Sequence, residues 1–399
     1  MVNNPDRWRP WRATDIDSLI YPHVIVSRFL GLFPFKRNSE SYEISKLRFA
    51  RSTIMVLAYL SAMSYLLYEI QSTETNLFPA WSQSWRSHTF LYILCNCVVI
   101  LATYAFTYDR LIVLQSLSKV SRVLSRRDFD DMAKFLHTKD IVVTLYHCFV
   151  LLYFVADSRL WTPRYFIVMA MPCATIQGEM FYANCVHILG GCFKKVDEML
   201  RRLNEPPPER SELLRTFRAL LNEQDASMLT RLKRCEKLHE EISDVVESLN
   251  KSYRGILTVI MVFEFYTITF SVYYFIEGFE SIDELDLESA AYRLLPFSSI
   301  VYGLTKFSTT IWLCETTTNH ANQIATTINI VHADCTDTAV RQELRCFALQ
   351  VAHRDIRFSA KTFVMNAKLL SQLLGQIVIY VMILFQFMFD TNCDDKRLS

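Results

Sequence analysis

Apolar residues gather into seven long runs along this chain, and charged residues are concentrated between the runs. The runs are residues 52–68, 89–108, 141–156, 165–193, 255–276, 294–314 and 369–389. A helix needs about 20 consecutive apolar residues to cross the hydrocarbon core of a bilayer. The pattern therefore predicts seven transmembrane helices, of which the third is short and has to recruit residues from its flanks.

Some of the segments between the runs are long and show helical periodicity. Residues 209–253 predict a charged amphipathic helix that continues into the fifth span. Residues 316–368 predict a second helical stretch, with a turn near 332–337, that continues into the seventh span. Such helices either pack within one chain or form a platform that joins subunits. The shortness of the other loops favours the platform.

The N-terminal apolar stretch, residues 19–35, is broken by His23 and Arg28 and is preceded by acidic residues. We expect a helix at the membrane surface here rather than a signal peptide. The predicted fold is all-α, a polytopic membrane protein whose long cytoplasmic helices form an anchor domain. Its parts are an N-terminal arm (1–51), spans one to six (52–314), anchor helices (315–368), a pore-lining span seven (369–389) and a tail (390–399).

Composition agrees with a membrane protein. Hydrophobic residues make up 51% of the 399 positions, and most of the 11 cysteines lie inside the apolar runs without a metal-like pair spacing. We interpret those cysteines as small apolar side chains rather than as disulfides or metal ligands. The formal net charge of +1 gives no electrostatic reason to expect a nucleic-acid partner.

Lysine and arginine divide unequally between the two sides of the predicted spans. The N-terminal arm, the loop after span two, the segment after span four and the segment before span seven hold 35 of the 42. Because cytoplasmic segments are enriched in these residues, we expect the N-terminus in the cytoplasm and the C-terminus outside. G-protein-coupled receptors have the opposite orientation. The one glycosylation sequon, at Asn250, would lie inside and stay unmodified.

Catalytic motifs are missing from the sequence. The run His239-Glu240-Glu241 begins like a zinc-protease helix but lacks the second histidine, and there is no phosphate-binding glycine loop or nucleophile turn. We therefore expect no enzyme activity, no metal site and no cofactor.

Three charged residues lie inside predicted spans, where they are functional candidates. Glu264 and Lys306 lie at similar depths in spans five and six, so we expect them to pair, either as a purely structural ion pair or as a network that couples ligand to gate. Glu179 in span four has no evident cationic partner in the sequence. It either lines a water-filled cavity or is hydrogen-bonded near a wet helix end.

Aromatic residues are dense, with 28 Phe, 19 Tyr and 6 Trp. Those in or just beyond the outer halves of spans two to six could wall a cavity that binds a small organic ligand by stacking, with a few polar groups for hydrogen bonds. The candidate pocket residues are Tyr92, Asn96, Tyr153, Trp161, Phe166, Gln177, Glu179, Tyr266, Tyr273, Phe297 and Tyr302.

Span seven carries a stripe of polar and apolar residues at helical spacing. The stripe consists of Gln372, Gln376, Ile379, Ile383, Gln386 and Asp390. Because glutamine facing lipid is costly, the stripe should face either other helices or water; we favour an axial pore with an apolar constriction at the two isoleucines. Asp390, Asp394 and Asp395, with acids of the loop at 277–288, would then attract cations to its outer mouth.

The last span also carries a family resemblance. Residues 379–387, Ile-Tyr-Val-Met-Ile-Leu-Phe-Gln-Phe, resemble the insect gustatory receptor signature, in which Thr-Tyr is followed by five hydrophobic residues and Gln-Phe. Tyr380, Gln386 and Phe387 match, whereas Ile379 replaces the usual threonine. The segments at 347–360 and 31–34 also resemble that family, and its fructose-type and broadly expressed branches are the most similar.

The resemblance implies a tastant-gated, non-selective channel for cations such as Na⁺, K⁺ and Ca²⁺. Such a channel is a homotetramer in the plasma membrane of sensory neurons, is surrounded by membrane lipid and needs no G protein. Phe387 would block the closed pore and Gln386 would turn inward on opening. Assembly with other gustatory receptors stays open, as do the alternatives of an olfactory-type channel subunit or a non-channel seven-span receptor or transporter.

Overall fold

Residues 9–38, 41–71, 83–156, 163–203, 223–280, 287–361 and 363–398 are described by the structure, a computed structural model. Nearly all of them are helical. The helices are α1 (Ile16–Leu19), α2 (Tyr21–Phe29), α3 (Lys46–Gln71), α4 (Gln83–Ala105), α5 (Thr107–Val120), a 3₁₀ turn (Ser121–Val123), α6 (Arg126–Ala156), α7 (Pro163–Arg201), α9 (Glu223–Glu280), α10 (Leu287–Asp334), α11 (Thr338–His353) and α12 (Ala367–Leu398). Two short strands, β1 (Phe35–Arg37) and β2 (Tyr42–Ile44), pair antiparallel.

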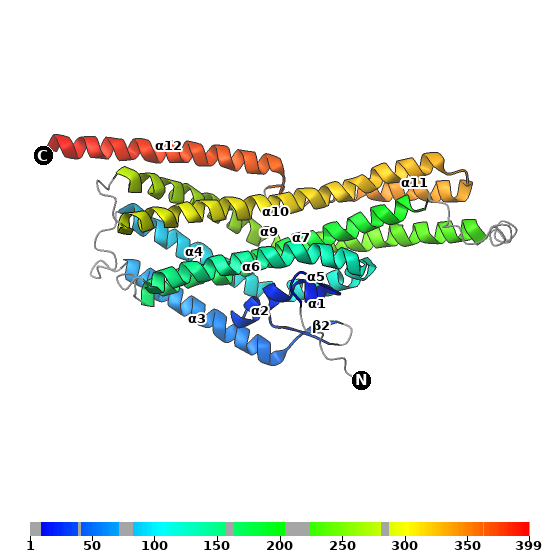
Figure 1. Cartoon of the computed structure of the whole chain (residues 1–399), viewed down its shortest axis with the longest axis horizontal. Helices are drawn as coiled ribbons and strands as arrows, with labels where there is room; N and C mark the ends of the chain where they lie inside the picture. Colours follow the sequence, from blue (N-terminus) through cyan, green and yellow to red (C-terminus); the bar gives the residue numbers. More distant parts are fainter. Residues whose placement is uncertain are drawn as a thin grey trace.

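The long helices run roughly along one common axis (Figure 1). Helix α7 lies inside the bundle and packs against α6, α9 and α10. Helix α12 lies along one edge, where it contacts α9 and, less extensively, α10. At the opposite end of the bundle, α11 folds back along α10 (Figure 1).

All seven predicted spans fall almost entirely within helices of the structure. Within the described residues, α3, α4, α6, α9 and α12 are long and apolar enough to cross a bilayer. The predicted fourth and sixth spans lie in α7 and α10, which carry Glu179 and Lys306. The short third span lies in a longer helix, because α6 begins at Arg126.

The N-terminal stretch packs against the bundle more closely than a surface helix would. In α2, His23, Val24 and Ser27 are buried, while Ile25 and Phe29 point outward. The chain then turns at Gly31 into β1. Gly31 has φ +74°, and a Cβ there would lie 2.8 Å from the Met55 side chain, so this turn requires glycine.

The helix predicted at 209–253 is seen from residue 223 onward, where α9 runs without interruption for 58 residues to Glu280. At about 1.5 Å per residue, α9 is roughly 87 Å long. It therefore extends well beyond a bilayer at one end. Residues 209–222 of the prediction lie outside the described residues.

The helix predicted at 316–368 does not continue into span seven. It ends at His353. Residues 354–361 and 363–366 are non-helical and belong to the segment before α12, which we call the connector. The connector places Ile356 and Phe358 in the core, with 7% and 1% exposure. Burying these two side chains favours an irregular path over another helical turn.

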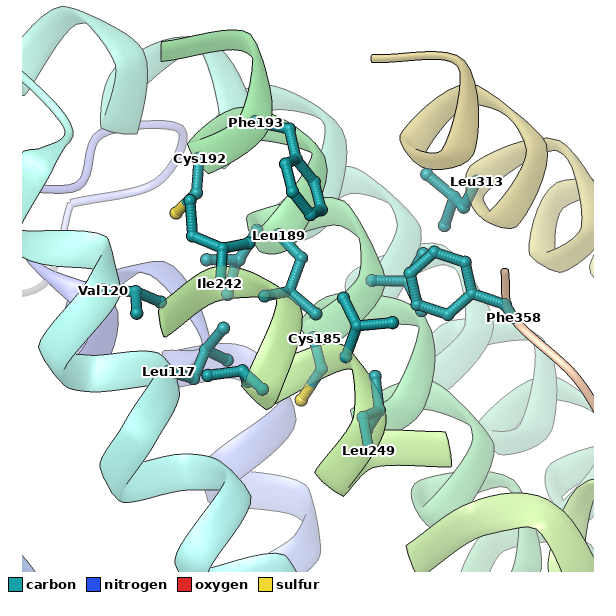
Figure 2. Packing of buried hydrophobic residues seen from close by; sticks show 14 of the residues in the cluster. Leu117, Val120, Cys185, Leu189, Cys192, Phe193, Ile242, Leu249, Leu313 and Phe358 are labelled. Carbon is teal, nitrogen blue, oxygen red and sulfur yellow. The ribbon is translucent and has the colours of Figure 1, made fainter. Parts of the chain in front are cut away.

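The main hydrophobic core lies where α5, α7, α9, α10 and the connector meet. Figure 2 shows Cys185 and Leu189 of α7 among Ile242 and Leu249 of α9, with Phe358 reaching in from the connector. The ten cysteines among the described residues are free thiols, and five of them are buried.

Candidate functional site

An ion cluster joins three helices inside the bundle. The ammonium of Lys306 in α10 lies 3.0 Å from the Oε2 atom of Glu179 in α7 and also contacts the Oε1 atom of Glu264 in α9. The three side chains are only 7–12% exposed. The matching depths had predicted contact between Glu264 and Lys306. The sequence interpretation of Glu179 was wrong on one point, because its cationic partner is the same lysine.

The cluster holds two carboxylates and one ammonium in a setting with little water. Buried charges cost several kcal/mol each unless paired, so Lys306 offsets the desolvation of both acids. Gly303 in α10 permits this approach, because a Cβ there would lie 3.0 Å from Ile268 and 3.6 Å from the Oε2 atom of Glu264. The three helices are therefore held at a fixed separation here.

A cluster of rings lies between α4 and α9. His88 stacks on Tyr266 with a centroid distance of 5.3 Å and also contacts Phe270 at 5.1 Å and Tyr274 at 5.8 Å. Tyr92, one helical turn from His88, lies 6.2 Å from it. Sequence reasoning missed His88, although residues 88, 92 and 96 share one face of α4 and residues 266, 270 and 274 share one face of α9.

Rings from α6 and α10 meet beside the ion cluster. Tyr146 stacks on Tyr302 at 4.3 Å, and His147 meets Tyr302 edge-on at 5.3 Å. The Lys306 ammonium lies 5.7 Å from the centroid of Tyr302. The Tyr302 ring and its neighbours therefore adjoin the charged residues. We call these residues, together with the ring cluster between α4 and α9, the ring-and-ion site.

Two tyrosine hydroxyls in the ring-and-ion site are buried without a hydrogen-bond partner among the described residues. They belong to Tyr266 and Tyr302. Buried polar atoms usually form hydrogen bonds with protein or water, so a hydrogen-bond partner is expected for each of these hydroxyls. A small ligand with polar atoms is one partner that would satisfy them.

The other predicted pocket residues divide into three groups. Tyr273 lies beside Tyr274 with ring centroids 5.2 Å apart, and Tyr153 lies on α6 and is partly buried. Phe297 contacts Phe275 at 5.6 Å but is 49% exposed on the outside of the bundle. Trp161 lies outside the described residues, and Phe166 lies in α7 without a described side chain.

Two predicted polar pocket residues form hydrogen bonds with other parts of the chain or within their own helix. The Gln177 carbonyl oxygen accepts the Ser27 hydroxyl at 2.9 Å, which ties α7 to α2. The Asn96 amide donates to the Tyr92 carbonyl at 2.8 Å within α4, while its own side-chain oxygen has no partner among the described residues. Gln177 is therefore part of the N-terminal packing rather than of the ring-and-ion site.

Helix α12 packs on its own subunit through one face only. Ile377 and Val381 are buried against α9 together with Ile268. The predicted stripe lies on the other side, where Ile379 is 51% and Ile383 is 40% exposed, and the side chains of Gln372, Gln376 and Gln386 are also exposed. Tyr380 is 49% exposed, but its ring contacts Phe265 of α9 edge-on at 5.5 Å, so it does not lie on the stripe side. Phe387, Asp390, Asp394 and Asp395 lie on the same continuous helix, but their side chains are outside what is described.

A small apolar hollow separates α12 from α9 and α10. One of its walls contains Glu264, the residue that also binds Lys306. The lining residues are Glu264, Phe265, Ile268, Leu304, Phe307, Leu370, Leu373, Leu374 and Ile377. Glu264 therefore belongs both to the ring-and-ion site and to the lining of the hollow beside α12.

Comparison with known proteins fixes the family. The profile described as 7tm chemosensory receptor matches residues 20–390 of the 399. The chain belongs to the 7tm chemosensory receptor family. No curated protein sequence matches this receptor significantly.

Solved structures share its fold. The insect olfactory receptor OR5 from Machilis hrabei matches this receptor with a TM-score of 0.65 at 11% identity, covering 92% of this chain and 97% of that one. A structure of OR5 in complex with eugenol matches with a TM-score of 0.56 at 13% identity and the same coverage. At such low identity the likeness shows the fold, which is that of a multi-pass membrane receptor.

Proposed function

We propose that this receptor is a ligand-gated, non-selective cation channel, rather than an enzyme, in which α12 from each of four subunits lines a central pore. The observation that carries this proposal is the exposure of the glutamine and isoleucine stripe. Its side chains point away from α9, roughly opposite the buried Ile377. Glutamine is costly against lipid, so a water-filled axis between copies is a favourable environment for it.

The ring-and-ion site is the proposed binding site for a small-molecule tastant. Its rings offer stacking surfaces, and the unpaired hydroxyls of Tyr266 and Tyr302 offer hydrogen bonds. A ligand held between α4, α9 and α10 would change the contacts of the Lys306 cluster. Through Glu264, that change would reach the residues that line the hollow beside α12. The charged cluster is therefore the proposed coupling network.

The gate is placed at Gln386 and Phe387, near the end of the stripe. Phe387 would close the pore, and rotation of α12 would replace it with Gln386. Asp390, Asp394 and Asp395 follow on the same helix and would concentrate cations at the mouth. This arrangement requires the C-terminal end of α12 to face outward, as the distribution of lysine and arginine supports.

A gustatory role in the plasma membrane of sensory neurons is supported by the Tyr380, Gln386 and Phe387 signature. The olfactory-type alternative is favoured by one specific observation, the structural likeness to OR5, which is bound to eugenol in one structure. The gustatory and olfactory-type alternatives differ in the ligand that opens the channel, and both assume the same channel.

The channel is tested by expressing the receptor alone in cultured cells and recording membrane current while sugars, bitter compounds and amines are applied. We expect a ligand-evoked cation current that persists when G-protein signalling is blocked and changes in gating or permeation in Gln386→Ala and Phe387→Ala. A current that needs G proteins, or that neither substitution alters, would count against the pore assignment.

A further inference from the structure

The connector between α11 and α12 is hydrogen-bonded to residues along one face of α9. We call this set of hydrogen bonds the fastening. Asn250, Arg254 and Thr258 are spaced four residues apart, so they lie along one face of that helix. Each makes a hydrogen bond with the connector backbone. The line begins below the fifth span and ends inside it, which is the level at which α12 starts.

Asn250 and Thr258 supply the side-chain part of this fastening. The Asn250 amide donates to the carbonyl of Arg357 at 2.7 Å, and its oxygen accepts the Ser359 N–H at 3.3 Å. The Thr258 hydroxyl accepts the Lys361 N–H at 3.1 Å, and the Arg254 carbonyl accepts it at 3.3 Å.

The bonded stretch of the connector is short. From Asn250 to Thr258, α9 rises about 12 Å at 1.5 Å per residue. The five residues from Arg357 to Lys361 span at most about 13–14 Å when fully extended. A segment of this length with hydrogen bonds near both ends moves with the helix to which it is bound.

The connector is also held just before this stretch and within it. Arg354 binds Asp244 at 2.8 Å, with Glu240 and Glu247 each at 3.8 Å. Phe358 is 1% exposed and lies in the core near Leu249 and Leu313 (Figure 2).

The connector leads directly into the first turn of α12. The Met365 N–H bonds the Phe358 carbonyl at 2.9 Å. The N-terminus of α12 is then held by two acceptors: Glu315 Oε2 takes the Ala367 N–H at 3.2 Å, and Asn366 Oδ1 takes the Leu369 N–H at 3.1 Å. A carboxylate at this position also complements the helix dipole.

We infer that Asn250 and Thr258 are positioning residues for the gate, because they make the base of α12 follow α9. Helix α9 carries Glu264 and the Tyr266, Phe270 and Tyr274 rings of the ring cluster. In α12, only 17% of the most apolar window is buried against the rest of the chain. The fastened connector is thus a second mechanical link between ligand site and pore, separate from the one through Glu264. This inference rests on the proposed channel function.

Thr258 allows a matched pair of variants that test this link. Thr258→Val keeps the shape of the side chain and removes the acceptor of the Lys361 N–H, and Thr258→Ser keeps the hydroxyl. The control is Thr309→Val in α10. The Thr309 hydroxyl donates within its helix at 2.7 Å, as that of Thr258 does at 2.9 Å, but no connector contact is described for it. Asn250→Asp keeps the acceptor and loses the donor to Arg357.

We expect Thr258→Val and Asn250→Asp to raise the half-maximal ligand concentration about fivefold or more, the scale of an ordinary coupling energy, and to lower the maximal open probability. Single-channel conductance and surface expression should stay unchanged, because neither residue faces the pore. Thr258→Ser and Thr309→Val should behave as wild type. Wild-type concentration–response curves in both Thr258→Val and Asn250→Asp would overturn the inference.

Amide hydrogen exchange separates failure of this link from failure of the channel proposal. In purified receptor, residues 355–372 should exchange faster in Thr258→Val and Asn250→Asp than in wild type or Thr309→Val. If wild type carries no ligand-evoked current, the channel proposal fails, and equal exchange in all four proteins would show that the fastening fails as well. Faster exchange with unchanged gating would show that the fastening is structural only and would overturn the positioning role.

Discussion

Charged residues inside the bundle differ in how much stability the protein would lose if each were removed. Among the described residues, Lys306 is the cation that pairs with both buried carboxylates, Glu179 and Glu264. Each acid shares its cation with the other. The lysine is therefore the member of the cluster whose loss leaves the most uncompensated charge.

We predict that Lys306→Met destabilises the receptor by about 3–5 kcal/mol, the usual penalty for breaking a buried ion pair. Glu179→Gln should cost far less, because it leaves Lys306 and Glu264 as a neutral pair. Thermal unfolding in detergent measures both variants. Equal midpoints for the two variants would contradict this account of the cluster.

The sequence predicted these charges as candidates because charge inside an apolar run is conspicuous. The contact of Lys306 with Glu179 was missed, since depth along a span says nothing of which neighbouring helix a side chain faces. His88 was missed although it shares a helix face with Tyr92. Recognising it required knowing that α4 packs on α9, which spacing within a single helix does not give.

At the scale of elements, α2 is docked through a buried histidine. His23 is 2% exposed, its Nε2 lies 3.2 Å from the Ser27 hydroxyl, and its ring lies 5.9 Å from Phe181. Burial lowers the pKa of His23 from 6.5 to about 4; nearby Asp140 opposes this shift, and Lys139 and Arg110 add to it. The folded receptor therefore holds His23 neutral.

We predict that docking of α2 weakens as the pH falls from about 6.5 towards 4. The unfolded chain takes up the proton first, so stability present above pH 6.5 is lost progressively, and the loss reaches about 3 kcal/mol at and below pH 4. Unfolding midpoints of wild type and His23→Gln, compared between pH 7 and 4.5, isolate this histidine from the others. Parallel pH profiles would show that His23 does not contribute.

Hydropathy predicted the long helices well, because apolar runs of this length are typical of membrane-spanning helices and uncommon elsewhere. It did not predict the connector at 354–366. Charged and apolar residues alternate there in a way that continues a helical pattern, and the irregular path depends on Phe358 finding a place among Leu249 and Leu313. Hydrogen bonds from Asn250 and Thr258, more than 100 positions away, complete the structure of this segment.

At the scale of the whole molecule, the isolated subunit leaves one side of α12 without a partner. Its stripe is exposed, whereas Ile377 and Val381 are buried against α9. Four copies arranged around that side would enclose the stripe, and the Lys- and Arg-rich segments would then lie in the cytoplasm. We therefore expect the stripe to line a water-filled pore.

Cysteine accessibility along α12 reports whether the stripe faces water in the open channel. Single cysteines at Gln376, Ile379 and Ile383 are compared with cysteines at Leu373, Ile377 and Val381, using a charged thiol reagent applied during ligand-evoked current and the unsubstituted receptor as background. We predict that the reagent alters the current irreversibly at the first three positions and leaves it unchanged at the other three. Modification confined to Leu373, Ile377 and Val381, or equal at all six positions, would contradict the pore assignment.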